Sequence, residues 1–584
     1  VLLSSLDESL IQHGKAFNLG VHRYGDVYEP RGHKYIRDFE IDKCITITYR
    51  VGGMVLRKEM MLANNKAQYF ARYTLLEANS QTILQLKPFL AFRHIHTLSK
   101  TNMDAERSSR EIPGGRAFRM YEGFPDLNLQ LSVKSDFISN PDWYYNIEYK
   151  EERRRAYEST EDLFVPGYFE LPIKKGQSII FSASTNVEKP AGLKAGFEKY
   201  KEARSSRESF ESCLKIASKQ FIVSDGDKLS IYAGYPWLDK NSRETLLALP
   251  GIALWGLGDK QKFNKILEDF IAREGSFPDS GGVKPDVPLW LIWNIQQYSI
   301  YTGSTKGVWR DAGGIIKDIL QRYREVKDGS SVVLHGNGLL WAERRGVALS
   351  WMDAYVNGAP VTEREGYQVE LNSLWYNAIS FALELASAAK ERSFTEEWEP
   401  LRKQVAKSFV KAFWIEHGDY LADYVGHEGQ NKCVRPNQLF TCSFPYSPLT
   451  EVQRSHVLKR VQQELLTERG IRTLSPVSPH FKGEYDGDEF SRNSAYHMGT
   501  ARPWLLGFYI DANFKLHGNA FLTKAEDLIS AFEEDVQIHC IGSVSEVYDG
   551  DPPHQPHGCT SYSISVASLL WAMRIIENHK NRKI

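Results

Sequence analysis

The hydrophobic residues of this chain change their spacing once, at Lys189-Pro190-Ala191-Gly192, and this change most narrows what the chain can fold into. Before it, apolar and polar residues alternate, as in Cys44-Ile-Thr-Ile-Thr-Tyr-Arg50, which is typical of strands with one buried face. After it, apolar residues recur at spacings of three and four, as on one side of a helix. The sequence therefore predicts a β-rich part followed by a helical part, and 584 residues are too many for one ordinary core.

Residues 1–189 predict an antiparallel β-sandwich, because strand-like segments recur there between turn residues. The polar stretch 100–116 predicts a loop. The chain opens at Val1 without Met, so we expect an N-terminal piece of this domain to be missing from the sequence. Residues 190–225 are charged and predict one linker helix between the domains.

Residues 226–584 predict paired helices joined by loops of unequal length, which is typical of a closed α/α barrel with its long loops at one end. A helical solenoid is the alternative, but no fixed repeat period is present. The predicted helices are Arg243–Leu257, Lys260–Arg273, Val287–Tyr301, Val308–Tyr323, Val369–Glu391, Glu396–Trp414, Leu449–Leu466, Tyr496–Ile510, Lys524–Asp535 and Ser561–Glu577.

Charge and composition exclude some classes of partner. A formal net charge of −1 gives no electrostatic reason to expect nucleic acid or an anionic membrane. No apolar run is long enough to span a bilayer and no signal peptide is evident, and the six cysteines have no paired spacing, so a cytoplasmic protein is expected. Aromatic residues make up 12% of the chain and weakly favour a carbohydrate site, because aromatic faces stack on sugar rings.

Two carboxylates stand out as candidate acid and base. Asp353 lies between Trp351-Met352 and Ala354, where burial is expected to raise its pKa, as a general acid requires. The structural alternative is a helix cap or a partner for Arg344 or Arg345. Glu546 lies in a short alternating run before a turn rich in Gly and Pro, a setting suited to the rim of a cavity.

Aromatic and charged residues recur in successive inter-helix segments, which is what a sugar site needs: an aromatic platform and planar hydrogen-bonding groups. Each segment taken alone has a structural alternative, such as a Trp packed between helices. We also expect Ser242 to cap the helix at residue 243. The predicted substrate-binding residues in these segments are Tyr235, Trp237, Arg243, Glu244, Asp286, Trp290, Trp351, Arg435, Asn437, Tyr496, His497 and Trp504.

Seven motifs, in order along the chain, resemble glycogen debranching enzymes, specifically their amylo-α-1,6-glucosidase module in its stand-alone bacterial and archaeal form. The motifs are Gly234-Tyr-Pro-Trp237, Arg243-Glu-Thr245 with Ala248-Leu-Pro-Gly251, Ser350-Trp-Met-Asp-Ala354, Leu371-Asn-Ser-Leu-Trp-Tyr-Asn377, Arg435-Pro-Asn-Gln438, Ala495-Tyr-His-Met-Gly-Thr500 with Pro503-Trp-Leu-Leu-Gly507, and Ser545-Glu-Val-Tyr-Asp-Gly550.

The resemblance implies a β-sandwich followed by a six-fold α/α barrel of the glucoamylase type, which hydrolyses α-1,6-linked glucose with inversion. It places the general acid on Asp353 and the general base on Glu546, adds Trp375 to the substrate-binding residues, and requires no metal or organic cofactor. The sequence departs from the family at Glu244, where Asp is usual, and at Ala501-Arg502, where an apolar residue and Trp are usual.

The resemblance also implies the partners: a branched malto-oligosaccharide or α-glucan as substrate, and glycogen phosphorylase or a separate glucanotransferase as a functional partner. Two alternatives remain open at this point. One is a glycoside phosphorylase on the same fold, against which Glu546 argues, and the other is a non-catalytic or regulatory α-glucan-binding protein.

Overall fold

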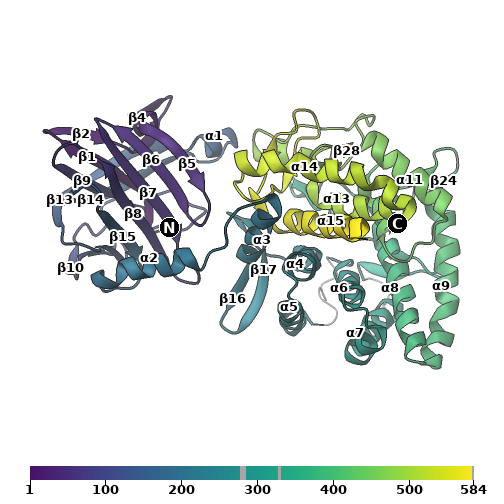
Figure 1. Ribbon diagram of the computed structural model, residues 1–584. Coiled ribbons are helices and arrows are strands. Elements are labelled where there is room, and N and C mark those ends of the chain that lie inside the picture. Colours follow the sequence, from purple (N-terminus) through teal and green to yellow (C-terminus); the bar gives the residue numbers. More distant parts are fainter. Residues whose placement is uncertain (276–283, 326–329, 582–584) are drawn as a thin grey trace. The chain divides into compact units, whose positions relative to one another are not determined.

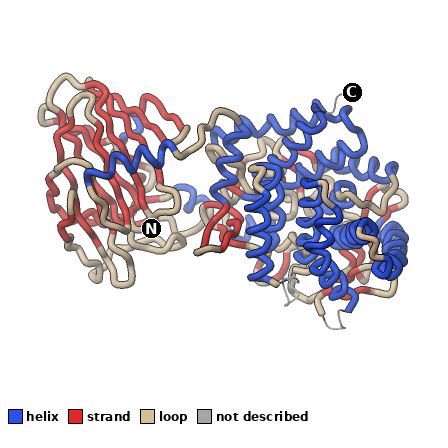
Figure 2. Tube along the Cα trace, turned by 60° about the horizontal axis from the view of Figure 1, so that its bottom comes forward, coloured by secondary structure: helices blue, strands red, loops and turns tan. Residues whose placement is uncertain are grey.

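The computed structural model describes residues 1–275, 284–325 and 330–581. The chain divides into two compact units, Val1–Glu208 and Ser209–Ile584. Strands dominate the first unit and helices the second (Figures 1 and 2). The predicted succession of antiparallel sheets and helices is therefore confirmed.

Two large antiparallel sheets, in the orders β13-β14-β9-β1-β2 and β10-β11-β12-β15-β8-β7-β6-β5, share one hydrophobic core in the first unit, and β3 and β4 form a separate two-stranded sheet. Strand β9 (Thr82–Leu90) shows the cause, since Leu84 and Leu86 are fully buried while Gln85 and Lys87 are partly exposed. The other strands are β1 (Leu3–Gln12), β2 (Lys15–Asn18), β3 (Val21–Tyr24), β4 (Val27–Arg31), β5 (Ile36–Ile41), β6 (Ile45–Val51), β7 (Met54–Leu62), β8 (Gln68–Glu77), β10 (Arg110–Ile112), β11 (Gly115–Phe118), β12 (Leu127–Leu131), β13 (Asp136–Glu148), β14 (Thr160–Ile173) and β15 (Ser178–Ser184).

Two local predictions for this region are wrong. The end of the predicted loop 100–116 forms the hairpin β10–β11, in which Ile112 pairs with Gly115 across a turn at Gly114 with φ of +70°. The predicted linker helix 190–225 is instead two helices, α2 (Leu193–Glu202) and α3 (Phe210–Phe221). Ser209 begins α3 with a capping box, because its hydroxyl accepts the Ser212 amide hydrogen while the Ser212 hydroxyl accepts the Ser209 amide hydrogen.

The second unit is built from helices of two kinds. Helices α6 (Val287–Thr302) and α8 (Val369–Ala388) are apolar around most of their circumference and are buried, whereas α7 (Thr305–Glu325) and α9 (Arg392–Phe413) bury one stripe and expose the other. The remaining helices are α4 (Ser242–Leu249), α5 (Lys260–Glu274), α10 (Leu439–Ser443), α11 (Glu451–Glu464), α12 (Glu489–Ala495), α13 (Leu506–His517), α14 (Leu522–Ile538) and α15 (Ser563–Asn581).

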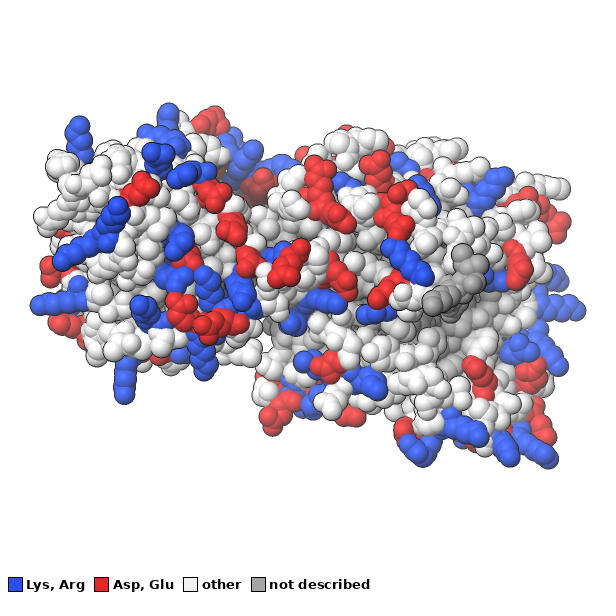
Figure 3. All heavy atoms as spheres, viewed as in Figure 1, with Lys and Arg blue, Asp and Glu red and all other residues white. Residues whose placement is uncertain are grey.

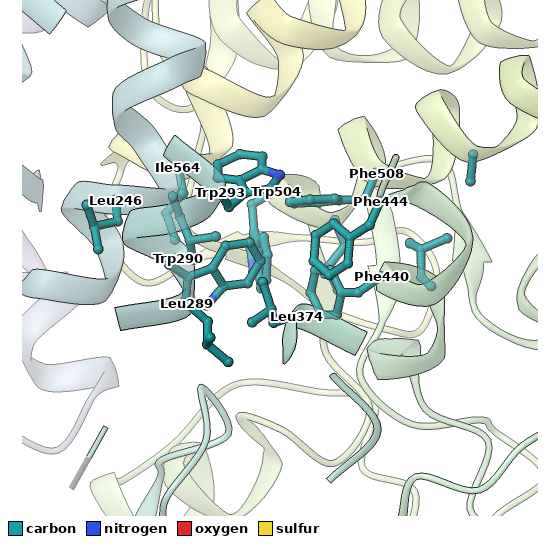
Figure 4. Close-up of a cluster of buried hydrophobic side chains, with 14 of the residues drawn as sticks. Leu246, Leu289, Trp290, Trp293, Leu374, Phe440, Phe444, Trp504, Phe508 and Ile564 are labelled. Atoms are coloured by element: carbon teal, nitrogen blue, oxygen red, sulfur yellow. The ribbon is translucent and has the colours of Figure 1, made fainter. Parts of the chain in front are cut away.

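An aromatic cluster fills the centre of this unit (Figure 4). The ring of Trp290 lies 5.3–5.9 Å from those of Trp293, Phe440 and Phe444 in edge-to-face contacts. Such contacts add to the free energy gained from burial alone. The cluster holds α6, α10 and the segment before α13 together beneath the residues of the site described below.

One predicted helix in this unit is confirmed in its span and another is wrong. The helix predicted over Arg243–Leu257 is α4 continued by a π-helical segment, Pro250–Gly256. Within Tyr496–Ile510, helix α13 begins only at Leu506. Gly499 there has φ of +151°, and a Cβ on it would lie 2.5 Å from the Lys482 carbonyl oxygen, so the backbone leaves the helical conformation before Pro503.

No described helix is both long enough and apolar enough to cross a membrane. On the face of the second unit shown in Figure 3, basic and acidic side chains are interspersed and neither sign forms a large patch.

Candidate active site

Asp353 lies in the irregular segment between β20 (Leu340–Ala342) and β21 (Tyr355–Val356). The buried Met352 fixes this segment, because its amide donates to Ser350 Oγ at 3.2 Å and its carbonyl accepts from Thr362 Oγ1 at 2.9 Å. The Asp353 side chain is 43% exposed. Its Oδ2 lies 3.4 Å from Nη1 of Arg243, and its Oδ1 lies 3.8 Å from Nε2 of His497. The carboxylate is thus held by its neighbours and open to solvent.

The pKa of Asp353 differs from the prediction. Partial burial raises this pKa, but the contacts with His497 and the positive charge of Arg243 outweigh it, so the pKa of the Asp353 carboxyl lies below its usual value. The expected burial of Asp353 beside Trp351 and Met352 is also wrong, since the carboxylate is partly exposed. The charged form of Asp353 is therefore favoured, and Arg243 is the cation at ion-pair distance from it, in place of the expected Arg344 or Arg345.

Arg243 is buried at the start of α4 and is fixed by Asp286. Its Nε and Nη2 donate to the two Asp286 oxygens at 2.8 Å each, and Trp290 Nε1 donates to Asp286 Oδ2 at 3.0 Å. Burial disfavours the guanidinium charge, yet the attraction of Asp286 raises the pKa of Arg243. Asn241, not Ser242, caps the helix by accepting from the Arg243 amide at 3.1 Å.

Glu244 follows Arg243 and is partly buried, with its Oε2 atom fully buried beside the same group of charges. Burial raises the pKa of its carboxyl more than Arg243 lowers it. Its Oε2 has no hydrogen-bond partner among the residues that the structure describes. A buried acceptor without a partner is costly, so this oxygen is well suited to accept from a ligand hydroxyl.

Glu546 lies just before β31 (Val547–Tyr548) and is 6% exposed. The Tyr496 hydroxyl donates to Oε1, and the Cys559 amide donates to Oε2 at 2.8 Å. The backbone of Glu546 is fixed to the same residue, because the Glu546 amide donates to the Cys559 carbonyl at 2.9 Å. Gly558 makes room with φ of +68°, since a Cβ there would lie 2.5 Å from Oε2. The carboxylate is therefore fixed through both oxygens.

The adjacent residues Tyr496 and His497 connect the two carboxylates, since Tyr496 contacts Glu546 and His497 lies 3.8 Å from Asp353. Burial lowers the pKa of His497 to about 4, so the imidazole is neutral near pH 7. Neither ring nitrogen has a hydrogen-bond partner among the described residues. Asp353 and Glu546 thus lie in one site, lined by groups with unused hydrogen-bonding capacity.

A buried polar network supports the site from beneath. Trp351 Nε1 donates to Asn437 Oδ1 at 2.7 Å, and Asn437 Nδ2 donates to Asp423 Oδ1 at 2.7 Å. Asp423 also accepts from Arg364 Nε at 2.8 Å, and Arg435 donates to the His497 carbonyl at 2.6 Å. This network fixes the Trp351 ring, which meets His497 edge to face at 5.3 Å.

Some predicted substrate-binding residues lie elsewhere. Trp375 is fully buried between Tyr323 and Trp398, with its Nε1 bonded to the Gly338 carbonyl, so its prediction as a sugar contact is wrong. Trp290 is 2% exposed and acts on the site through Asp286.

Two other predicted aromatic residues, Trp504 and Tyr235, contact segments next to the catalytic candidates. Trp504 is buried but meets Trp351 edge to face at 5.1 Å. Tyr235 and Trp237 are partly buried, and Tyr235 pairs with Ser561 beside the Glu546 loop.

The sequence reasoning missed Arg364 and Asp423, which support Trp351, and Tyr562, which is buried near Glu244 and Glu546. It also gave no role to Arg502, which lies 3.9 Å from Glu546. Among the described residues, no group of three His, Cys, Asp or Glu side chains is arranged to hold a metal ion.

The fold of the chain is glucoamylase-like. The chain is similar to a bacterial glucoamylase solved in complex with acarbose, with a TM-score of 0.57 and 10% identity over 99% of this chain and 89% of that chain. The family described as Amylo-alpha-1,6-glucosidase matches residues 216–571, and Glycogen debranching enzyme N terminal matches residues 1–180. The chain belongs to the amylo-alpha-1,6-glucosidase family, so the resemblance predicted from its motifs is confirmed.

The glycogen debranching enzyme of Saccharomyces cerevisiae is 26% identical over 235 residues. That match covers 32% of this chain and 15% of the yeast protein. The chain thus corresponds to a small part of that relative.

Proposed function

We propose that this protein is an inverting glycoside hydrolase that removes α-1,6-linked glucose at branch points of glycogen or a related α-glucan. The observation that carries the proposal is the pair Asp353 and Glu546, joined through Tyr496 and His497 in a chain of the amylo-alpha-1,6-glucosidase family. We further propose that residues 226–584 form a six-fold α/α barrel and residues 1–189 a β-sandwich domain.

In this mechanism Asp353 is the general acid and Glu546 the general base. Asp353 gives its proton to the glycosidic oxygen as the bond to the anomeric carbon breaks. Glu546 takes a proton from a water molecule, whose oxygen forms the new bond on the opposite face of the sugar. Inversion requires the two carboxyl groups to be about 6.5–9.5 Å apart, which leaves room for that water. The bonds to both Glu546 oxygens favour its charged form, as a base requires.

The unused hydrogen-bonding groups of the site would bind the terminal glucose. Glu244 and His497 offer an acceptor and a neutral imidazole, and Trp351 offers an aromatic face next to Asp353. A site that leaves such groups unpaired discriminates strongly against a ligand without the matching hydroxyls. Arg243, held by Asp286, keeps a positive charge beside the acid.

We also propose a cytoplasmic role in glycogen breakdown, in which glycogen phosphorylase or a separate glucanotransferase shortens the branches first. The substrate would then be a phosphorylase limit dextrin, and the product free glucose.

The test is glucose release from a phosphorylase limit dextrin, with the anomer followed by NMR. The wild type is compared with Asp353→Asn and Glu546→Gln. Matched controls are Asp419→Asn and Glu343→Gln. Asp419 is an exposed turn residue with φ of +55°, which Asn tolerates, and the exposed Glu343 bonds to Trp341 and His427. We expect β-glucose from the wild type and both controls, and a loss of at least about 10³-fold in both site variants.

Other outcomes would identify the alternatives. Glucose 1-phosphate formed only when inorganic phosphate is added would indicate a phosphorylase. Dextrin binding without any product would indicate a glucan-binding protein. α-Glucose as the first product would contradict inversion.

A further inference from the structure

Arg502 is a buried cation beside the proposed base. It lies in β30 (Ala501–Arg502), and its neighbour Ala501 pairs with Tyr548 two residues after Glu546. Its side chain is 3% exposed, and Nη1 lies 3.9 Å from Glu546 Oε1. This sheet register brings the guanidinium to the same carboxylate oxygen that accepts from the Tyr496 hydroxyl.

Arg502 also fixes Tyr496. Its Nη2 donates to the Tyr496 carbonyl at 2.8 Å, and the centre of its guanidinium lies 3.8 Å from the centre of the Tyr496 ring. A cation stacked on an aromatic face and bonded to the backbone of the same residue restricts both the ring and the chain. The direction in which the Tyr496 hydroxyl points is therefore set in part by Arg502.

The hydrogen-bonding groups of the Arg502 guanidinium are only partly satisfied by its neighbours, which a purely structural role does not explain. Its Nε has no hydrogen-bond partner among the described residues. Burial lowers the pKa of Arg502 to about 10, so the group still carries its charge near pH 7. By comparison, the buried Arg243 and Arg364 each form bidentate pairs with carboxylates. A buried charge without such a pair is costly, and a functional role explains why it is present.

We propose that Arg502 is a positioning residue for the base: its charge keeps the Glu546 carboxylate ionised in a buried site, and its contacts hold the Tyr496 hydroxyl on that carboxylate. The assignment of Glu546 as base rests on the proposed function, whereas the contact between Arg502 and Glu546 does not.

Other groups also face Glu546 and limit the size of the effect. The Tyr496 hydroxyl and the Cys559 amide stabilise the carboxylate by hydrogen bonds and remain in an Arg502 variant. Burial, followed by the charges of Glu244 and Glu546, raises the pKa of Tyr562, so this phenol stays neutral. The charge of Asp353 also reaches Arg502. Arg502 adds a cation within ion-pair distance of Glu546 to these groups.

The first experiment is the pH dependence of kcat/KM for Arg502→Met, Arg502→Lys and Arg472→Met. Arg472 is a matched control, because it is a partly buried arginine in the adjacent strand β29 (Gly470–Arg472) that donates to the Gly550 carbonyl. Removing a cation from beside a carboxylate makes the carboxylate easier to protonate. We expect the acid limb of the Arg502→Met profile to move to higher pH by about one unit or more. Arg502→Lys should retain most of the wild-type limb with a lower kcat, and Arg472→Met should keep the limb unchanged.

The second experiment does not depend on turnover. Infrared difference titration of wild type minus Glu546→Gln isolates the carboxyl band of Glu546, and the same difference is recorded in the Arg502→Met background. We expect its midpoint to rise by about one unit. Equal midpoints would overturn the proposal even if the enzyme is active. A raised midpoint in a protein that releases no glucose would retain the role of Arg502 and contradict the proposed function instead. If Arg502→Met does not fold, the Arg502→Lys titration decides, since a lysine that leaves both midpoint and kcat unchanged would overturn the positioning role.

Discussion

Arg364→Met is expected to destabilise the helical unit strongly although Arg364 contacts neither catalytic candidate. Its guanidinium is 3% exposed and bonds to both oxygens of Glu370 and both oxygens of Asp423. Methionine fills a similar volume without the charge, so the variant leaves the buried Glu370 without its cation, and Asp423 keeps Arg435, whose Nε lies 3.6 Å from Oδ2.

Breaking a buried ion pair by removing one partner costs about 3–5 kcal/mol. A unit of this size loses about 2 °C in Tm for each kcal/mol, which gives a decrease of roughly 6–10 °C at pH 7. Burial already raises the pKa of Glu370, against the opposing charge of Arg364. A carboxyl group whose pKa is higher in the folded than in the unfolded state contributes its full stabilisation below the pKa of the unfolded state. That contribution is lost as the pH rises through the pKa of the folded state. The Tm deficit of the variant should therefore shrink as the pH falls toward 5.

The assay is calorimetric Tm measured between pH 5 and 8 for Arg364→Met, Asp423→Asn and the double variant. Because the two residues share one network, their effects should be non-additive, and the double variant should be more stable than the sum of the single changes predicts. A deficit below about 2 °C, or one that is the same at every pH, would refute the argument that buried charge is its cause. Arg402→Met is the control, since Arg402 pairs with Glu399 on a partly exposed surface and should cost less than about 1 kcal/mol.

Three further predictions concern the site. Tyr496→Phe removes the hydroxyl that donates to Glu546. Because a hydrogen bond to a charged group is worth about 1.5–3 kcal/mol, kcat/KM for the limit dextrin should fall about 10- to 150-fold. An unchanged kcat/KM would show that this hydrogen bond has no role in catalysis. Substrate covers the exposed Asp353 and excludes water, which raises its pKa, so the alkaline limb of kcat should lie at higher pH than that of kcat/KM; coincident limbs would contradict this coupling. Trp375→Ala should lower the free energy of unfolding by about 3–5 kcal/mol, because Trp375 is fully buried. At a temperature where the variant is folded, its affinity for the dextrin should stay within about twofold of the wild type. A large loss of affinity would indicate that Trp375 contacts the sugar.

The sequence predicted most of the fold because its local patterns agree with the tertiary structure. The amphipathic stripes of α7 and α9, and the alternation in β9, each follow from burial of one face. The secondary-structure predictions were wrong where contacts with residues distant in the sequence determine the backbone conformation. At Gly499 the backbone turns to φ of +151° close to the Lys482 carbonyl, although the apolar spacing favours a helix, and no local signal in Tyr496–Ile510 indicates that neighbour.

The candidate site was predictable only in part. Arg243 and Glu244 precede an apolar helix, which indicates a charged group at a helix start, and the structure brings both near Asp353. The support beneath Trp351 was not predictable, because Arg364 and Asp423 are 59 residues apart and each looks like an ordinary surface charge in the sequence. The lowered pKa of Asp353 was likewise hidden, since it depends on the contact with His497 and on the charge of Arg243, and both residues are far from Asp353 in the sequence.

The two carboxylates are prepared for their proposed roles in opposite ways. Glu546 is buried, bonded through both oxygens and close to Arg502, so its charged form is built into the protein before any substrate binds. Asp353 is 43% exposed, and its neighbours favour the charged form, which is the wrong form for an acid. Only a ligand that excludes water from Asp353 and engages Arg243 or His497 can return its proton affinity to the range that an acid needs. Free energy from binding the glucan is then used to prepare the acid, so a poorly fitting substrate loses kcat as well as affinity.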